Sequence, residues 1–328
     1  MKTKDRTLDA AALEKLISAA VAAPSMHNTQ PWRYRLDSGT RTLELHAATE
    51  RAVRHADPNG RALRISAGAS LFNLRVAADH LGWEPVVRLL PDPGEPTLLA
   101  TVRLAGPPRA DTHGGRDLYE AIWRRHSSRF PFSDRRLPAE VVNQLIEAAR
   151  AEGACAHFPG TDETCRLLEL TAEGERRNLA DSERRGESDS WVRERADTGI
   201  PPGAVGPLDA GAHLPMRSFT EPGFPRRPPP AVFEPRPLIA VLTTAFDGPG
   251  DWLRSGQALQ RILLVATANG VRASLLHQAL EWPDLRWALR DTHDGPEHAQ
   301  MLIRLGYGPS GPTTPRRSPQ EVLDDGPR

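Results

Sequence analysis

The sequence has no excess of charge of either sign. Lys and Arg together number 42 among 328 residues, and Asp and Glu together also number 42. Binding to nucleic acid or to an acidic membrane surface through the overall field requires a net positive charge, so we expect neither partner. An anionic ligand would have to be held by a local group of cationic side chains.

Cysteine is scarce as well. The two cysteines, Cys155 and Cys165, are ten residues apart, and this spacing fits no zinc or redox motif. Reduced thiols are typical of cytoplasmic proteins. We therefore expect two buried, reduced thiols, a cytoplasmic location and no bound metal.

Long apolar runs are also missing. A membrane-spanning helix needs about 20 apolar residues, whereas the longest run here, 238–246, has the length of a strand. An Ala-rich stretch near the N-terminus resembles a signal peptide only superficially, because Glu14 and Lys15 interrupt it. Apolar residues between 8 and 21 follow helical spacing instead, which predicts a helix with Thr7 as its N-cap.

What the sequence does contain is an internal repeat. Segment 13–20 (LEKLISAA) resembles segment 142–149 (VNQLIEAA), at an offset of 129. Segments 68–71 (GASL) and 256–259 (GQAL) also match, at an offset of 188, and each has a further glycine fourteen residues after its first residue. The repeat indicates two copies of one unit. Chance similarity between Ala- and Leu-rich helices is the alternative.

Each copy carries a helix followed by a strand. Gly82 and Gly270 stand where left-handed helix caps are expected, and candidate strands follow at 98–104 and 301–305. Helices and strands in separate segments favour an α+β layered core. We expect a first half over 1–115 and a second half over 116–328. The larger offset requires an insertion at about 183–237, where eleven prolines predict a long loop.

The first candidate functional segment is 23–32 (APSMHNTQPW). Pro24 and Pro31 prevent the preceding helix from continuing, so a rigid loop presents the side chains of Ser25, Asn28 and Gln30. These groups suit the edge of a planar heterocycle that offers donors and acceptors. A polar capping turn is the alternative, because Ser and Asn favour such turns.

The second segment is 124–132 (RRHSSRFPF). Arg125 and Arg129 are four residues apart with Ser127 between them, and together they can converge on one phosphate. The alternative is a solvated basic turn, since charge runs are usually exposed.

These two segments resemble the paired flavin signatures of the nitroreductase family. Segment 125–129 is similar to its Arg-x-Ser-x-Arg/Lys motif, and segment 24–32 to its Pro-Ser-x-x-Asn-x-Gln-Pro-Trp motif. The chain resembles more closely the fused, single-chain, Acg-like branch, from about residue 8 to 322. The resemblance implies the FMN-dependent nitroreductase fold in two tandem diverged copies that form an intrachain pseudo-dimer.

The resemblance also implies a single shared site. The first copy has no Arg/Ser motif before its first helix, and the second copy has 151–156 (AEGACA) where the proline-bounded loop should be. One complete FMN site across both copies is therefore expected, with the other site degenerate.

By resemblance, thirteen residues are expected to contact FMN. They are Pro24, Ser25, Met26, Asn28, Gln30, Arg125, His126, Ser127, Arg129, Leu275, His277, Arg316 and Arg317. Leu275 and His277 belong to the turn 274–278, where family amides approach the reactive edge of the ring. His277 stands where many members have an acid, although a solvated histidine is the alternative. Trp32 is expected in the core.

The implied activity is that of an FMN-dependent NAD(P)H oxidoreductase. Hydride from NADH or NADPH would pass through the flavin to a nitroaromatic, a quinone or a similar small-molecule acceptor, without a catalytic side chain. The alternative is a flavin storage or sequestration protein whose insertion closes the site as a lid. Insertion arginines could instead accept an NADPH phosphate, namely Arg193, Arg195, Arg217, Arg226 and Arg227. We expect a monomeric pseudo-dimer that can pair into a further homodimer.

Overall fold

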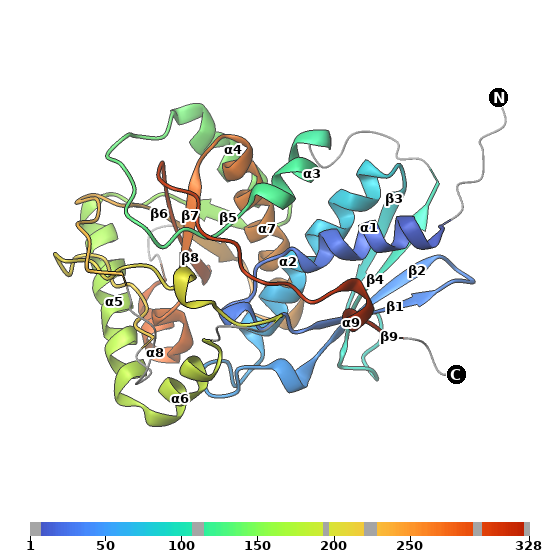
Figure 1. The fold of residues 1–328 in the computed structure, drawn as a ribbon, viewed down its shortest axis with the longest axis horizontal. Helices are drawn as coiled ribbons and strands as arrows, with labels where there is room; N and C mark the ends of the chain where they lie inside the picture. Colours follow the sequence, from blue (N-terminus) through green and yellow to red (C-terminus); the bar gives the residue numbers. More distant parts are fainter. Residues whose placement is uncertain (1–7, 107–114, 193–196, 220–227, 291–296, 325–328) are drawn as a thin grey trace.

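The computed structural model describes residues 8–106, 115–192, 197–219, 228–290 and 297–324. Two β-sheets lie on opposite sides of a central pair of helices (Figure 1). The first sheet contains β1 (Trp32–Asp37), β2 (Thr42–Ala47), β3 (Glu84–Leu89), β4 (Leu98–Ala105) and β9 (Leu323–Asp324). The second contains β5 (Cys155–His157), β6 (Leu238–Thr244), β7 (Arg272–Leu276) and β8 (His298–Gly306).

The two sheets have the same strand order. The first runs β1-β2-β4-β3 and the second runs β5-β6-β8-β7, with antiparallel neighbours throughout. The helices repeat as well: α1 (Ala10–Val21) precedes β1 as α4 (Ala139–Arg150) precedes β5, and α2 (Arg61–His80) and α7 (Pro249–Ala268) occupy matching places. The predicted α+β duplication is confirmed, and chance similarity does not explain it.

The central helices α2 and α7 cross at a pair of glycines. A Cβ atom on Gly68 would lie 2.2 Å from the carbonyl oxygen of Leu253, and one on Gly256 would lie 2.1 Å from that of Ile65. Gly68 and Gly256 are the residues that the sequence repeat matches. Equivalent residues that face each other across a contact are the mark of two-fold symmetry, so the two copies pack as a pseudo-dimer.

Each apolar core takes side chains from both copies. Leu253 and Leu264 of α7 belong to the core beneath the first sheet, and Ile65 of α2 belongs to the core beneath the second. Strand β9 joins the first sheet beside β1, in parallel (Figure 1). The predicted boundary between 115 and 116 falls at the start of α3 (Gly115–Arg124), and it stays a prediction.

Most local predictions are confirmed. Gly82 and Gly270 have φ values of +84° and +72°, as left-handed caps require, and Trp32 is fully buried. Asp9 caps α1 through its side chain, whereas the predicted cap, Thr7, lies outside the described residues.

Two local predictions need correction. Both cysteines are exposed, not buried, and both are free thiols. The insertion is not wholly a loop. It begins with a helix, α6 (Ser182–Ser190), which comes directly after α5 (Thr161–Ala180). The rest of its described part is irregular around a small apolar cluster of its own: Val192, Ile200, Ala204, Val205 and Phe219.

Two short helices complete the second copy: α8 (Pro283–Ala288), and α9 (Pro319–Val322), which leads into β9. Among the described residues, no helix is long and apolar enough to span a membrane.

Candidate functional site

One cavity takes its walls from both copies of the fold. It encloses about 850 Å³ between the atoms that line it, counting its open mouth. The first copy supplies the proline-bounded loop and the start of α2, and the second supplies the Arg/Ser segment and the end of β7. Seven of the thirteen predicted residues line it: Pro24, Ser25, Met26, Ser127, Arg129, Leu275 and His277.

The loop from the first copy has an unusual backbone. Its short 3-10 helix, η1 (Met26–Asn28), contains His27 at φ +50° and Asn28 at φ +54°, and Gln30 follows at φ +51°. Left-handed backbone costs a non-glycine residue about 1–2 kcal/mol. Residues held in this way cluster at binding sites. A hydrogen bond from the Gln30 backbone N–H to Ser25 Oγ, 2.9 Å long, helps to hold the turn.

The side chain of Asn28 is turned toward other segments of the chain. Its amide nitrogen donates to the carbonyl oxygens of Gly199 and Pro315, at 2.8 and 2.9 Å. Its amide oxygen accepts from Arg316, at 2.9 Å. Asn28 therefore ties the insertion and the C-terminal segment to the loop, and its expected contact with the ring stays a prediction.

The side chain of Gln30 also connects the loop to the insertion and to the C-terminal segment. It is fully buried, donates to the carbonyl oxygen of Asp197 at 2.9 Å and accepts from the backbone N–H of Arg317 at 2.8 Å. The guanidinium of Arg317 donates to the carbonyl oxygens of Trp32 and Glu321, so it braces the C-terminal segment. Neither Gln30 nor Arg317 lines the cavity.

Arg125, which is buried, and Arg316, which is partly buried, form a pair of cations beside the loop. Both guanidinium groups donate to the carbonyl oxygen of Ala22, at 3.4 and 3.3 Å, and the Nε atom of each is buried without a hydrogen-bond partner. Within the described ranges, neither forms an ion pair with a carboxylate. Buried cations are costly unless they are paired. The arrangement therefore suits an anion.

The pKa values of these arginines report their surroundings. Burial lowers the pKa of Arg125 to about 10, and burial together with the nearby charge of Arg125 lowers that of Arg316 to about 9. Burial and the nearby charges of Arg125, Arg316 and Arg272 lower the pKa of His126. A neutral His126 adds no positive charge to the pair.

Arg129 lies in different surroundings from Arg125. It lines the cavity and donates to the carbonyl oxygen of Ala204 in the insertion, at 2.8 Å. Burial and the charge of Arg217 lower its pKa to about 10. The two arginines of the segment thus have different neighbours: Arg316 for Arg125, and the insertion for Arg129. Their predicted convergence on one phosphate stays a prediction.

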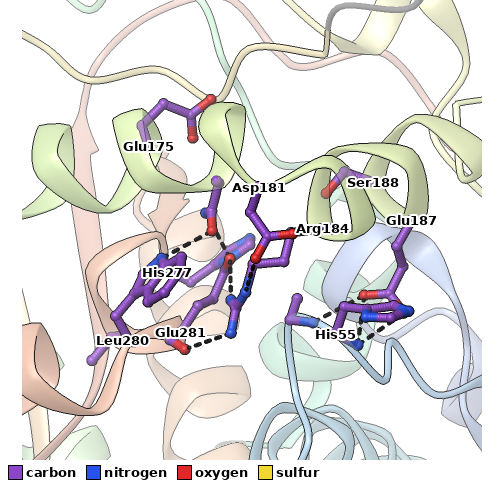
Figure 2. Close-up of polar contacts among 12 residues, drawn as sticks. His55, Glu175, Asp181, Arg184, Glu187, Ser188, His277, Leu280 and Glu281 are labelled. Carbon is purple, nitrogen blue, oxygen red and sulfur yellow. Dashed lines mark hydrogen bonds and ion pairs between the residues drawn. The ribbon is translucent and has the colours of Figure 1, made fainter.

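Figure 2 shows His277 facing Glu281, a residue of the 3-10 helix η4 (Ala279–Glu281). His277 Nδ1 lies 2.6 Å from Glu281 Oε1. Arg217 from the insertion pairs with the same carboxylate, and Asn178 of α5 donates to its other oxygen at 2.7 Å. Burial raises the pKa of Glu281, but Arg217 and His277 together bring it below its usual range. His277 is therefore a bonded cavity residue and not a solvated one.

The insertion contacts the cavity at several points. The ring of Phe219 meets that of His27 edge-on, 5.9 Å between centroids, and Arg217 is buried in its ion pair with Glu281. Arg217 is thus not free to accept an NADPH phosphate, which corrects that expectation. The other four insertion arginines, Arg193, Arg195, Arg226 and Arg227, lie outside the described residues.

Several cavity residues carry no motif and escaped the sequence analysis. Asp57, Arg61 and Ser66 approach from the start of α2, and Glu281 and Met301 approach from the second copy. Segment 274–276 also belongs to strand β7 and not to a turn. Only tertiary packing brings these residues to the cavity.

Comparison with known proteins gives one consistent answer, although no family model matches the chain. A Mycobacterium tuberculosis protein named "Putative NAD(P)H nitroreductase Rv3131" is 32% identical over 324 residues, which cover 96% of this chain and 92% of the relative. "Putative NAD(P)H nitroreductase acg", from the same organism, is 27% identical over 322 residues and 95% of each chain.

Among solved structures, a nitroreductase with bound FMN from Bacteroides fragilis is 15% identical, with a TM-score of 0.36. The likeness covers 61% of this chain and 92% of that one. The full-length match to the first relative is decisive. The chain belongs to the nitroreductase family.

Proposed function

We propose that the protein is an FMN-dependent NAD(P)H oxidoreductase that reduces a nitroaromatic, a quinone or a similar small acceptor. The observation that carries the proposal is the pair Arg125 and Arg316, which has no carboxylate partner among the described residues. Both donate to the carbonyl oxygen of Ala22, directly before the loop that lines the cavity. The names of the relatives support the electron donor, because they specify NAD(P)H.

The residues present fit FMN. Arg125 and Arg316 would hold its phosphate, since their unpartnered Nε atoms match an oxyanion in charge and hydrogen bonding. The wall formed by Pro24, Ser25 and Met26 would border its ring, in a cavity that Arg129 also lines. FMN supplies the hydride-accepting group when bound, and the protein positions it.

We further propose one FMN per chain, in a chain that is complete as a pseudo-dimer. Two FMN molecules per chain would contradict this proposal. The mass of the particle in solution, measured by light scattering, would show whether two chains pair further.

A second candidate is a flavin storage protein with little turnover. The insertion favours it, because contacts hold this segment against the cavity wall and the proline-bounded loop: Arg217 to Glu281, Arg129 to Ala204, and Asn28 to Gly199. A cover held by a buried ion pair opens less readily than one held by surface contacts.

Anaerobic mixing of the FMN-loaded protein with excess NADH or NADPH separates the two functions. Rapid loss of the yellow colour, followed by its return on adding a quinone, is expected of the oxidoreductase. Persistent colour with both donors would refute it. The storage function predicts persistent colour in the native chain and bleaching in the double variant Arg217→Met with Glu281→Gln, which removes both charges of the pair.

A further inference from the structure

A cluster of three different metal-ligand side chains lies in the second copy, apart from the residues that line the cavity. It consists of Cys155, His157 and Glu297. The cysteine sulfur, an imidazole nitrogen and a carboxylate oxygen all lie within 4.8 Å of one another. Cys155 is exposed and the other two are partly exposed, so an ion from solvent can reach them.

The second sheet brings these residues together. Cys155 and His157 are two apart on strand β5, so their side chains leave the same face, and Ala156 between them is buried on the other. Glu297 directly precedes β8, which pairs with β6, and β6 in turn pairs with β5. Thr243 of β6 lies opposite Cys155 in the register.

The three side chains already point at a common place. His157 Nε2 lies 2.9 Å from the Glu297 carboxylate, and Thr243 Oγ1 donates to the same carboxylate and lies 3.2 Å from His157 Nε2.

We propose that Cys155, His157 and Glu297 bind a divalent transition-metal ion of the zinc type. Sulfur, imidazole nitrogen and carboxylate oxygen are the donors that Zn²⁺ takes in proteins, whereas Mg²⁺ and Ca²⁺ take oxygen almost exclusively. Zinc bonds of about 2.0–2.3 Å place two tetrahedral ligands roughly 3.5 Å apart. The observed ligand atoms lie within 4.8 Å of one another, so binding would require the side chains to move closer together, and a water molecule could complete the set.

The ion would join the short edge strand β5 to the start of β8. An ion that binds only the folded chain stabilises it by mass action. Metal binding would also displace the proton of the Cys155 thiol, because the thiolate is the ligand form. The site needs no flavin, so it stands or falls independently of the proposed oxidoreductase function.

The test is a titration of the reduced full chain with Co²⁺, followed by displacement with Zn²⁺ in the presence of a competing chelator. We expect one Co²⁺ per chain with a sulfur-to-cobalt charge-transfer band, and affinity weaker by more than about 100-fold in Cys155→Ala and in His157→Ala. The matched control is Cys165→Ala, because Cys165 is the other exposed thiol and lies on α5. It should bind as the native chain does.

A second readout protects the test against a variant that folds poorly. Glu297→Gln keeps the shape of the side chain, and it should weaken Co²⁺ binding while leaving the circular dichroism spectrum unchanged. Zn²⁺ should raise the Tm of the native chain and of Cys165→Ala, but not that of Cys155→Ala. Absence of the charge-transfer band in the native chain, or an equal band in Cys155→Ala, would overturn the proposal.

Discussion

The two copies differ most where the first helix of each passes into its first strand. In the first copy, residues 22–31 form a long turn with three non-glycine residues at positive φ, and β1 then begins at the fully buried Trp32. In the second copy, the four residues 151–154 connect the helix to the strand. Only Gly153 among them has a positive φ, and β5 begins at the exposed Cys155. Both copies have therefore kept the same scaffold, whereas the proline-bounded turn that lines the cavity is present only in the first copy.

The largest effect on FMN binding should come from removing Arg125 and Arg316, the two cations beside the long turn of the first copy. Arg125→Ala with Arg316→Ala removes two charge-assisted contacts to a phosphate, each worth about 1.5–3 kcal/mol. We expect FMN affinity to fall by at least about 100-fold, measured by fluorescence titration. The double variant Arg88→Ala with Arg103→Ala, on the exposed side of the first sheet, is the control. If the variant that lacks both arginines stayed yellow through purification, these arginines would not be the ones that bind the FMN phosphate.

The second test concerns the symmetry of the two copies. Gly68→Ala puts a Cβ atom 2.2 Å from a backbone oxygen, and Gly256→Ala does the same at 2.1 Å. Overpacking of this kind costs about 1–3 kcal/mol, and the two variants should lose similar free energy of unfolding in urea. Gly186→Ala, in the open on α6, should instead be neutral or stabilising. Markedly unequal losses at Gly68 and Gly256 would contradict the symmetric crossing.

A smaller effect is expected at the turn itself. Asn28→Leu removes the amide that holds Arg316 and the backbone of Gly199. We expect FMN affinity to fall about tenfold, equivalent to about 1.4 kcal/mol, and the insertion to be cleaved faster in limited proteolysis. Asn143→Leu, at an exposed position on α4 of the second copy, should change neither measurement. Unchanged affinity in Asn28→Leu would count against the shared site.

The smallest expected effect is on the pH dependence of stability. Burial, followed by the charge of Arg217, holds the pKa of His27 well below its usual value, so His27 is neutral in the folded chain. The unfolded chain takes up this proton below about pH 6.5. The corresponding stability is present above that pH and is lost as the pH falls, by up to about 1.4 kcal/mol per pH unit.

His27→Asn should flatten this dependence, because it removes the buried imidazole, and Asn tolerates positive φ. Urea unfolding at pH 5.5 and 7.5 measures the difference. His213→Gln, whose side chain is 79% exposed, should leave the dependence as it is. An equal slope in the native chain and in His27→Asn would show that other groups carry the effect.

Local chemistry explains what the sequence predicted well. Gly82 and Gly270 end helices because only glycine adopts that backbone cheaply, so their positions mark the repeat directly. The proline-bounded turn was predictable because Pro24 and Pro31 prevent a helix from continuing. The helix α6 was not, because its sequence SERRGESDS has no apolar period, and only the capping residue Asp181 signals its start.

Contacts distant in the sequence explain the rest. The direction of the Asn28 and Gln30 side chains depends on segments about 170 and 290 residues away, which no local pattern records. The cluster at Cys155 could not be predicted for the same reason: His157 is two residues away, but Glu297 is about 140 residues away and directly precedes strand β8. A search for cysteine spacing alone predicts no metal there.

The shared interiors have a consequence for the stability of each copy. Leu253 and Leu264 of the second copy belong to the first core, and Ile65 of the first copy belongs to the second. Neither copy therefore forms its apolar core from its own residues alone. A chain cut after Gly106 would yield two pieces that each display apolar surface made for the other. We therefore expect neither copy to fold stably without the other, and loss of either copy would also remove one wall of the shared cavity.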